Sequence, residues 1–430
     1  MKKSISGIRG IVGEDLKLDD VLRFCRNFAP VIKSKKCTVG NDTRPSNNMV
    51  RGVAIAALLE QGIDVYNLGM VPTPVMFREA RKYGAGLIIT SSHNPLPWNG
   101  LKFIINGRGP NEMEFAHILK EKQTQQTKFG IEYGATSSYV NDAAKIIGRI
   151  GHRPKILVDV GGGAASFVAP QLLRKLGCRV DIINQDISSR GPDPTADKLT
   201  KLVSNSKKYD IGFAFDLDGD RVVVVKDGKK QSPDTTLALG TIKALELGYK
   251  KFCLSIDTSI AVEKYIKDHG GRVVRSKVGE ANVIDMMLKE KCQAGGEGSS
   301  GGFILPEFNM CRDGILTSGL IAAMTGKKII DEVIKFVSSY HQLRTKIDVE
   351  SHLHDKTLTK LVQKLKSEFS EIITLDGVKI IIDDDTWILV RKSNTEDIIR
   401  ISVESDNLQK AQQIQKRITS LVKQSHEQIR

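Results

Sequence analysis

The chain has 430 residues, of which 40% are hydrophobic and 27% are charged, with a formal net charge of +14. It is too long for one ordinary core and too apolar to be disordered, so several globular domains are expected. Apolar runs such as residues 53–59 are far shorter than the roughly 20 residues of a membrane-spanning helix. Because the first residues contain no apolar stretch typical of a signal peptide, we expect a cytoplasmic protein that does not bind a membrane.

The six cysteines are scattered, with no C-x-x-C pair and no Cys–His cluster, so neither a zinc site nor a disulfide framework is expected. Lysine and arginine alternate with aspartate and glutamate and do not form basic tracts. The positive charge therefore favours a solvated surface that attracts small anionic substrates, and no nucleic-acid partner is expected.

One pattern recurs three times along the chain: an amphipathic helix ends at a glycine, and an apolar strand follows. It occurs at residues 57–65, 171–180 and 265–273. In each case the glycine supplies a left-handed C-cap. Together with short buried strands predicted at 86–90, 155–160, 211–215 and 252–256, the pattern predicts three α/β domains with helices on both faces of mixed or parallel sheets.

The last part of the chain differs from the rest. A polar helix is predicted over 356–369, followed by strands at 378–382, 387–390 and 398–403 and by a terminal helix, which together indicate a smaller α+β domain. The segment 121–138, rich in Gln, Thr, Lys and Ser, is predicted to be a surface connection, with an exposed helix as the alternative. The expected domains are 1–138, 139–237, 238–346 and 347–430.

An acidic loop directly follows the predicted strand 211–215 and contains Asp216, Asp218 and Asp220. Three carboxylates at alternate positions can converge on one hard cation if the chain turns at Gly219. A calcium loop would need more ligands and a distal glutamate, whereas residues 222–225 are all valine. The pattern predicts a magnesium site, and an acidic turn without a metal is the alternative.

A serine loop, Thr90-Ser-Ser-His-Asn-Pro95, follows the predicted strand 86–90. A serine nucleophile needs a base or a charge-neutralising metal, and His93 together with the acidic loop could offer both to Ser92. Taken alone, this string is interpreted equally well as a turn with a capping serine.

Two later loops are suited to a phosphorylated sugar. The glycine-rich segment 295–302 contains Glu297, which could accept hydrogen bonds from two adjacent sugar hydroxyls, although many such loops are only flexible. The segment 391–395, Arg-Lys-Ser-Asn-Thr, offers cations and small polar side chains around a turn, which is typical of a phosphate site. A polar β-hairpin is the alternative for the second loop.

Together and in this order, the four loops resemble those of the α-D-phosphohexomutase superfamily over essentially the whole chain. The resemblance implies three related α/β domains and a smaller fourth around a central cleft. It also implies an intramolecular phosphotransferase (an isomerase) that interconverts hexose 6-phosphate and hexose 1-phosphate through a phosphoserine and a 1,6-bisphosphate. The resemblance further implies one Mg²⁺ per active site and hexose 1,6-bisphosphate as activator. It implies a phosphorylated hexose as substrate and a monomer or homodimer.

The resemblance also assigns roles to individual residues. It implies that Ser92 is the phosphoserine and that Arg9, His93 and Lys102 are catalytic. Ser92 and the three aspartates would be the metal ligands. The substrate-binding residues implied are Arg221, Lys277, Glu297, Ser299, Arg391, Ser393, Asn394 and Thr395. The last four would hold the phosphate that does not react.

The sugar loop and the run 278–283 are most similar to archaeal-type members, which favours phosphoglucosamine mutase over phosphomannomutase/phosphoglucomutase. The segment 299–302 departs from the usual shorter Ser-Gly-His, and Glu396-Asp397 stands where many members have an acid and a proline. A haloacid-dehalogenase-type phosphatase is a rival, but its motif continues with a threonine where this chain has Asp220-Arg221. A non-catalytic sugar-phosphate-binding protein is the more distant alternative.

Overall fold

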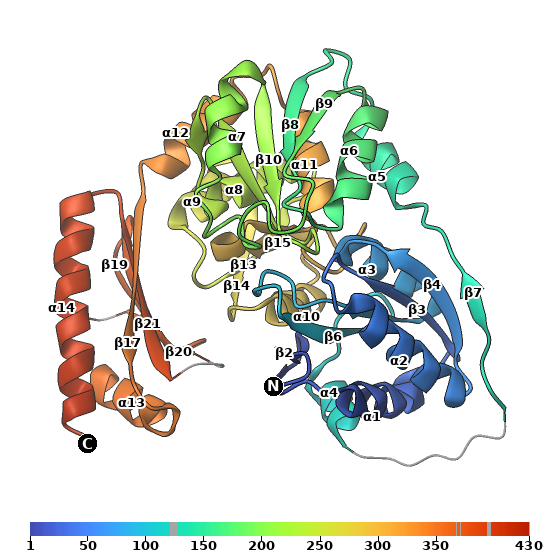
Figure 1. The fold of residues 1–430 in the computed structure, drawn as a ribbon. Coiled ribbons are helices and arrows are strands. Elements are labelled where there is room, and N and C mark those ends of the chain that lie inside the picture. Colours follow the sequence, from blue (N-terminus) through green and yellow to red (C-terminus); the bar gives the residue numbers. More distant parts are fainter. Residues whose placement is uncertain (121–127, 367, 370, 394–396, 430) are drawn as a thin grey trace.

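The computed structural model describes residues 1–120, 128–366, 368–369, 371–393 and 397–429. Four sheets follow one another along the chain and are arranged in an arc (Figure 1). Three belong to α/β units, and the fourth belongs to a smaller C-terminal α+β domain, so the predicted fold class is confirmed. No helix in the described part of the chain combines the length and the hydropathy needed to cross a bilayer.

The first sheet has the strand order β1-β2-β6-β5-β3-β4-β7. Its strands are β1 (Lys2–Ser4), β2 (Gly7–Ile11), β3 (Lys36–Asn41), β4 (Asp64–Met70), β5 (Ala85–Ile89), β6 (Trp98–Ile105) and β7 (Glu132–Gly134). Its helices are α1 (Leu18–Phe28), η1 (Ala29–Val31), α2 (Asn47–Glu60), α3 (Thr73–Tyr83) and α4 (Glu112–Leu119). Of the predicted connection 121–138, residues 121–127 lie outside the described residues, and β7 pairs with β4 and extends the sheet, which the sequence did not predict.

The second sheet has the order β12-β11-β10-β8-β9. Its strands are β8 (Lys155–Asp159), β9 (Arg179–Ile183), β10 (Ile211–Phe215), β11 (Val222–Lys226) and β12 (Lys229–Lys230). The helices are α5 (Tyr139–Ile147), α6 (Ala165–Leu176), α7 (Thr200–Asn205) and η2 (Ser206–Lys208). Strand β10 pairs parallel with β8 and antiparallel with β11, so the loop between β10 and β11 turns at one edge of the sheet.

The third sheet has the order β14-β13-β15-β16. Its strands are β13 (Lys251–Ser255), β14 (Arg272–Ser276), β15 (Ala294–Glu297) and β16 (Gly302–Ile304). The helices are α8 (Pro233–Glu246), α9 (Ile260–Asp268), α10 (Glu280–Glu290), η3 (Gly298–Ser300), α11 (Gly314–Ala322) and α12 (Ile329–Ser338). Side chains of the second and third units pack into one hydrophobic core. The division expected between residues 237 and 238 falls inside α8.

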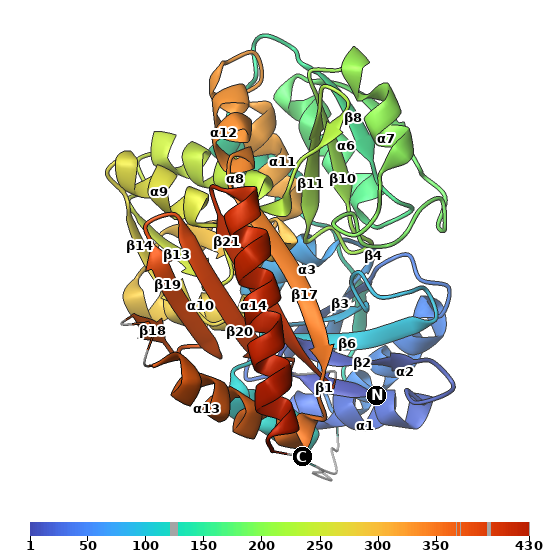
Figure 2. The same cartoon turned by 90° about the vertical axis from the view of Figure 1, so that its left-hand side faces the viewer.

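The fourth sheet has the order β17-β21-β20-β19-β18. Its elements are β17 (His341–Asp348), η4 (Ser351–Leu353), α13 (His354–Leu365), β18 (Ile372–Ile373), β19 (Val378–Asp383), β20 (Thr386–Lys392), β21 (Ile398–Ser405) and α14 (Leu408–Glu427). The division expected between residues 346 and 347 falls inside β17. Helix α14 covers the outer face of this sheet, and the other face turns toward the centre of the molecule (Figures 1 and 2).

The helix–glycine–strand pattern has the predicted geometry. Gly62, Gly177 and Gly270 have φ angles of 70°, 104° and 75°, in the left-handed region that favours glycine. They follow α2, α6 and α9 and precede β4, β9 and β14. The pattern therefore forms the equivalent helix-to-strand connection in each of the three α/β units.

Candidate active site

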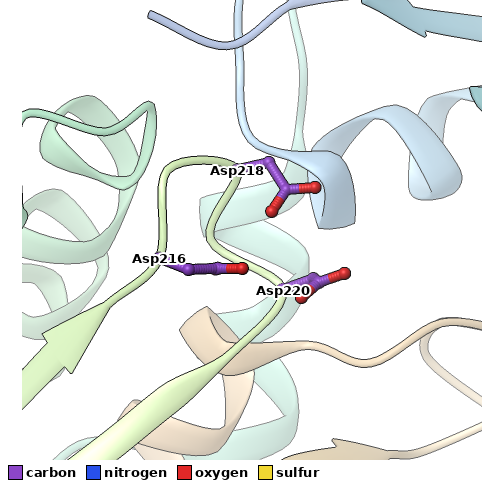
Figure 3. A group of neighbouring side chains, drawn as sticks. All are labelled: Asp216, Asp218 and Asp220. Carbon is purple, nitrogen blue, oxygen red and sulfur yellow. The ribbon is translucent and has the colours of Figure 1, made fainter. Parts of the chain in front are cut away.

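The three aspartates of the acidic loop lie together between β10 and β11 (Figure 3). One carboxylate oxygen from each lies within 4.8 Å of the other two, and all three side chains are fully buried. Gly219, with φ of 71°, provides the turn that brings Asp220 back beside Asp216 and Asp218. The predicted convergence is therefore present in the fold.

The electrostatics of this cluster suit a divalent cation. Burial and repulsion from the neighbouring carboxylates raise the pKa of Asp216 well above its ordinary value and also raise the pKa of Asp218. Asp218 Oδ1 and Asp220 Oδ1 are buried and accept no hydrogen bond from any residue the structure describes. An all-oxygen set with unused acceptors is the environment that Mg²⁺ prefers, so the residues present fit this ion.

Ser92 lies next to the acidic cluster although it comes from a different domain. Its hydroxyl donates to Asp216 Oδ2 at 3.2 Å, and its Oγ lies 3.3 Å from His93 Nδ1. The φ angle of Ser92 is 49°, an uncommon left-handed conformation for a serine. Burial, together with the Arg221 guanidinium, lowers the pKa of His93 to about 3, so the imidazole is neutral at neutral pH.

Sequence reasoning missed the pair that fixes this loop, Asp42 and Arg44. The buried Arg44 guanidinium donates to the carbonyls of Ser92 and Asn94, each at 2.7 Å, and pairs with Asp42 Oδ2 at 3.1 Å. Asp42 also accepts from the Thr90 hydroxyl at 2.6 Å. Because β3 and β5 are parallel neighbours, residues directly after β3 must lie beside the serine loop after β5, and this adjacency is the signal that could have revealed them.

The predicted cations Arg9, Lys102 and Arg221 surround the same cluster. The Lys102 ammonium lies 3.1 Å from Glu280 Oε1 and 3.7 Å from Asp220 Oδ2. Burial disfavours its charge, but these carboxylates outweigh burial and raise the pKa of Lys102. Burial also lowers the pKa of Arg9, and this effect outweighs Asp218 and Asp220, whose charges act to raise it.

Arg221 closes the acidic loop from the other side. Its backbone N–H donates to Asp216 Oδ1 at 3.1 Å, and its Nη1 lies 3.3 Å from Asp193 Oδ2. The Arg221 side chain therefore lies beside these carboxylates and also lines the neighbouring cavity.

Arg312 is the third residue that sequence reasoning missed. Its guanidinium lies 2.7 Å from Asp220 Oδ2, 3.0 Å from Glu297 Oε2 and 3.3 Å from Glu280 Oε2. Burial disfavours the charge of Arg312, but the three carboxylates outweigh burial and hold its pKa well above the ordinary value. Arg312 therefore joins the acidic cluster to the sugar loop, and only its position before the N-cap residue Asp313 could have drawn attention to it.

A cavity of about 600 Å³ brings residues of all four domains together. It is lined by the predicted residues His93, Arg221, Glu297, Ser299 and Arg391, and by Arg312. Ser393 is buried, and Asn394 and Thr395 lie outside the described residues. Lys277 is exposed and is not among the lining residues, although its neighbour Val278 is.

The family models agree with this four-domain fold. The phosphoglucomutase/phosphomannomutase alpha/beta/alpha domains I, II and III match residues 1–129, 137–229 and 232–340, and the C-terminal domain of the same family matches residues 349–421. The chain therefore belongs to the phosphoglucomutase/phosphomannomutase family and is an enzyme of the phosphohexomutase class, as its resemblance to that superfamily implied.

Individual curated proteins and solved structures are also similar to this chain. The chain is 34% identical to a probable phosphoglucosamine mutase of Methanothermobacter thermautotrophicus, covering 96% of this chain and 95% of that protein. It is 33% identical to one of Pyrococcus abyssi, covering 97% of each. A phosphoglucomutase/phosphomannomutase family protein from Burkholderia thailandensis has the same fold, with a TM-score of 0.86 at 24% identity over 99% of this chain and 98% of that one. Aspergillus fumigatus N-acetylphosphoglucosamine mutase, solved with GlcNAc-6P and magnesium, has a TM-score of 0.63 at 13% identity, covering 99% and 96%.

Proposed function

We propose that the chain is a phosphoglucosamine mutase that interconverts glucosamine 6-phosphate and glucosamine 1-phosphate. The observation that carries the proposal is the Ser92 hydroxyl, buried 3.2 Å from a carboxylate of the three-aspartate cluster, beside a cleft with arginines on its opposite wall. Relatives that match nearly the full chain are named for this activity, which supports the choice of sugar.

Mg²⁺ fits the acidic cluster, and Asp216, Asp218, Asp220 and an oxygen on Ser92 would hold it. The unused acceptors Asp218 Oδ1 and Asp220 Oδ1 support this assignment. When bound, the ion supplies positive charge that neutralises the phosphoryl group in transfer. The fungal N-acetylphosphoglucosamine mutase of the same fold was solved with magnesium.

The chain's own residues account for two phosphoryl transfers. In the first, the bond between phosphorus and Ser92 Oγ breaks and a bond from phosphorus to the free sugar oxygen forms; the sugar hydroxyl gives up its proton, and Ser92 Oγ takes one up. The product is a hexose 1,6-bisphosphate. In the second transfer, after the sugar has turned, Ser92 Oγ gives up its proton and receives the other phosphoryl group, and the sugar oxygen left behind takes up a proton.

Four side chains are placed to assist these transfers. His93 Nδ1, 3.3 Å from Ser92 Oγ, and Lys102 are positioned to exchange protons, while Arg9 and Arg221 supply positive charge. Fixed positions and charge neutralisation account for the catalysis. A bisphosphate that escapes leaves Ser92 unphosphorylated, so added hexose 1,6-bisphosphate should activate the enzyme.

The cleft wall opposite the acidic cluster would bind the sugar phosphate. Glu297 and Ser299 would bind sugar hydroxyls, and Asp193 and Asp257 line the same cavity and favour a cationic amine at carbon 2. The residues proposed for the phosphate that does not react are Arg391, Ser393, Asn394 and Thr395. The exposed Lys277 would make at most a peripheral contact with substrate.

The test is ³¹P NMR of the purified protein with Mg²⁺ and a trace of hexose 1,6-bisphosphate. Separate samples contain the 1-phosphates of glucosamine, N-acetylglucosamine, mannose and glucose. The expected result is conversion of glucosamine 1-phosphate to the 6-phosphate far faster than the others. Equal conversion of mannose and glucose phosphates would replace the proposal with a phosphomannomutase/phosphoglucomutase, and release of inorganic phosphate alone would contradict mutase activity.

A further inference from the structure

The turn between β18 and β19 packs against the backbone of an arginine that lines the cavity. This turn contains Asp376 and Gly377. Gly377 has a φ angle of 81°, and a Cβ atom added to it would lie 2.3 Å from the Val390 carbonyl oxygen and 2.8 Å from Arg391 Cα. Only glycine can approach the next strand so closely. The position of the turn is therefore tied to that of Arg391, whose side chain lines the cavity.

Asp376 connects this turn to the third α/β unit. Its Oδ2 accepts a hydrogen bond from the Val278 backbone N–H at 3.0 Å, and the same oxygen lies 3.9 Å from Arg391 Nη1. Val278 and Leu375 pack against one small apolar cluster, whose buried members come from both the third unit and the C-terminal domain. Asp376 therefore docks the turn, and with it Arg391, on the third unit.

The backbone that Asp376 contacts is also held by the sugar loop. The Gly279 N–H, directly after Val278, donates to Glu297 Oε1 at 2.7 Å, and the Val278 carbonyl accepts from Asn282 Nδ2 at 2.7 Å. Two consecutive backbone N–H groups thus bind Asp376 of the C-terminal domain and Glu297 of the third unit. This short segment therefore sets how far Arg391 lies from Glu297.

We propose that Asp376 is a positioning residue, which holds Arg391 at a fixed distance from Glu297 through its hydrogen bond to the Val278 N–H. The inference rests on the proposed function, in which Arg391 binds the phosphate that does not react and Glu297 binds sugar hydroxyls. The contact with Val278 has the length of a normal hydrogen bond, whereas the contact with Arg391, at 3.9 Å, is longer than one. Because an asparagine oxygen can accept the same hydrogen bond, asparagine should replace Asp376 and alanine should not.

The test measures both binding and turnover with the full chain and Mg²⁺. Calorimetric titrations with glucosamine 6-phosphate use a Ser92→Ala background, and steady-state kinetics use the otherwise wild-type protein. Asp376→Ala is expected to raise Kd and KM about fivefold, as for the loss of one hydrogen bond, and to lower kcat less than about twofold. Asp376→Asn should restore Kd and KM to within about twofold of the wild-type values. Asp384→Ala, at an exposed position between β19 and β20, is the matched control and should change neither value.

A double-mutant cycle shows whether Asp376 acts through Arg391. In an Arg391→Ala background, Asp376→Ala should raise Kd less than about twofold further, because the group that it positions is gone. A full fivefold effect in that background, or an equal loss of binding in Asp376→Asn and Asp376→Ala, would overturn the positioning role.

The activity of the wild-type protein is read separately from these binding data. Turnover of glucosamine 1-phosphate, with Kd and KM unchanged in Asp376→Ala, would reject the positioning role alone. The expected pattern of Kd values in a protein that converts no hexose phosphate would reject the proposed function and retain the positioning role.

Discussion

The two ends of the cleft are built differently. At the acidic end, Asp216, Asp218 and Asp220 are fully buried, and Arg312 contacts three carboxylates within 3.3 Å. At the C-terminal end, Arg391 is only partly buried, and its ion pair with Asp376 spans 3.9 Å.

The difference matches two tasks. Making and breaking bonds to phosphorus requires fixed charges in a site shielded from water, which the buried end provides. Under the proposed function, the open end would accept a phosphate attached to either carbon 1 or carbon 6 of the sugar, and loosely held cations tolerate both. Changes at the buried end should therefore reduce kcat and stability, whereas changes at the open end should raise KM.

Ser92→Ala should reduce kcat more than about 10⁴-fold, because no oxygen remains to carry the phosphoryl group. Ser91→Ala is the matched control, since the Ser91 hydroxyl oxygen accepts a hydrogen bond from Asn94 at 3.0 Å and is not placed to carry a phosphoryl group. The NMR assay described above measures both variants. Normal turnover by Ser92→Ala with loss of activity in Ser91→Ala would move the nucleophile to the neighbouring residue.

Asp218→Asn should reduce kcat about 10³-fold, because it removes one of three carboxylates that would hold the cation. Chelation should abolish activity, and added Mg²⁺ should restore it. Asp268→Asn, at the exposed end of α9, is the control and should leave kcat unchanged. Full activity after exhaustive metal removal would contradict the magnesium site.

Arg312→Lys should reduce kcat/KM about 100-fold, because one ammonium cannot replace a guanidinium fork that contacts Asp220, Glu280 and Glu297. It should also lower the free energy of unfolding by about 3 kcal/mol, since buried carboxylates lose their partner. Steady-state kinetics and denaturant titration measure the two effects. Arg417→Lys, at an exposed position of α14, is the control and should keep wild-type values. If Arg312→Lys also keeps wild-type values, Arg312 is not part of the site.

Arg391→Lys should raise KM for the hexose phosphate about tenfold, because a guanidinium can contact a phosphate through two parallel hydrogen bonds and an ammonium cannot. Its kcat should fall less than about threefold, which sets it apart from every change at the buried end. Lys392→Gln, whose native lysine pairs with Asp355 at 2.7 Å on the surface, is the control. A large fall in kcat with an unchanged KM would erase the contrast between the two ends.

The prediction for Lys379 concerns how the C-terminal domain docks on the third unit and not the chemistry of the site. Its ammonium donates to the Ile256 carbonyl at 2.8 Å and lies 4.3 Å from the centre of the Trp387 ring. Burial, with a contribution from Arg275, lowers the pKa of Lys379 to about 7. Since the unfolded value is about 10.4, the unfolded chain binds the extra proton between these two values, and stability rises with pH across this window.

Relative to wild type, Lys379→Met should therefore raise the free energy of unfolding by roughly 3 kcal/mol more at pH 6.5 than at pH 9.5, at about 1.4 kcal/mol per pKa unit. Below pH 7, Lys379 is charged in both the folded and the unfolded protein. Burying this charge lowers the stability of the wild type, and a buried methionine has no such cost. Denaturant titrations at the two pH values measure the difference, with Lys416→Met as control. Parallel pH profiles for wild type and Lys379→Met would show that Lys379 titrates normally.

What the sequence could predict follows from how local each feature is. The acidic loop was predicted from aspartates at alternate positions after a strand, with a glycine turn. Ser92 was predicted as a candidate from its position just after another strand. Arg312 reaches Asp220 across 92 residues, and Arg44 reaches Ser92 across 48, and no local pattern encodes such contacts. The position of Arg391 opposite Arg400, across β20 and β21, depends on sheet register, which short apolar runs leave undetermined.

The most direct test of the central claim is the fate of a labelled phosphate. Purified protein is incubated with glucosamine 1,6-bisphosphate carrying ³²P, desalted, and analysed by peptide mass mapping, and a second portion is mixed with unlabelled glucosamine 1-phosphate. The account predicts label on Ser92 that transfers to sugar when substrate is added. Turnover with the label on another residue, or with no labelled protein at any time, would contradict a phosphoserine mechanism at Ser92.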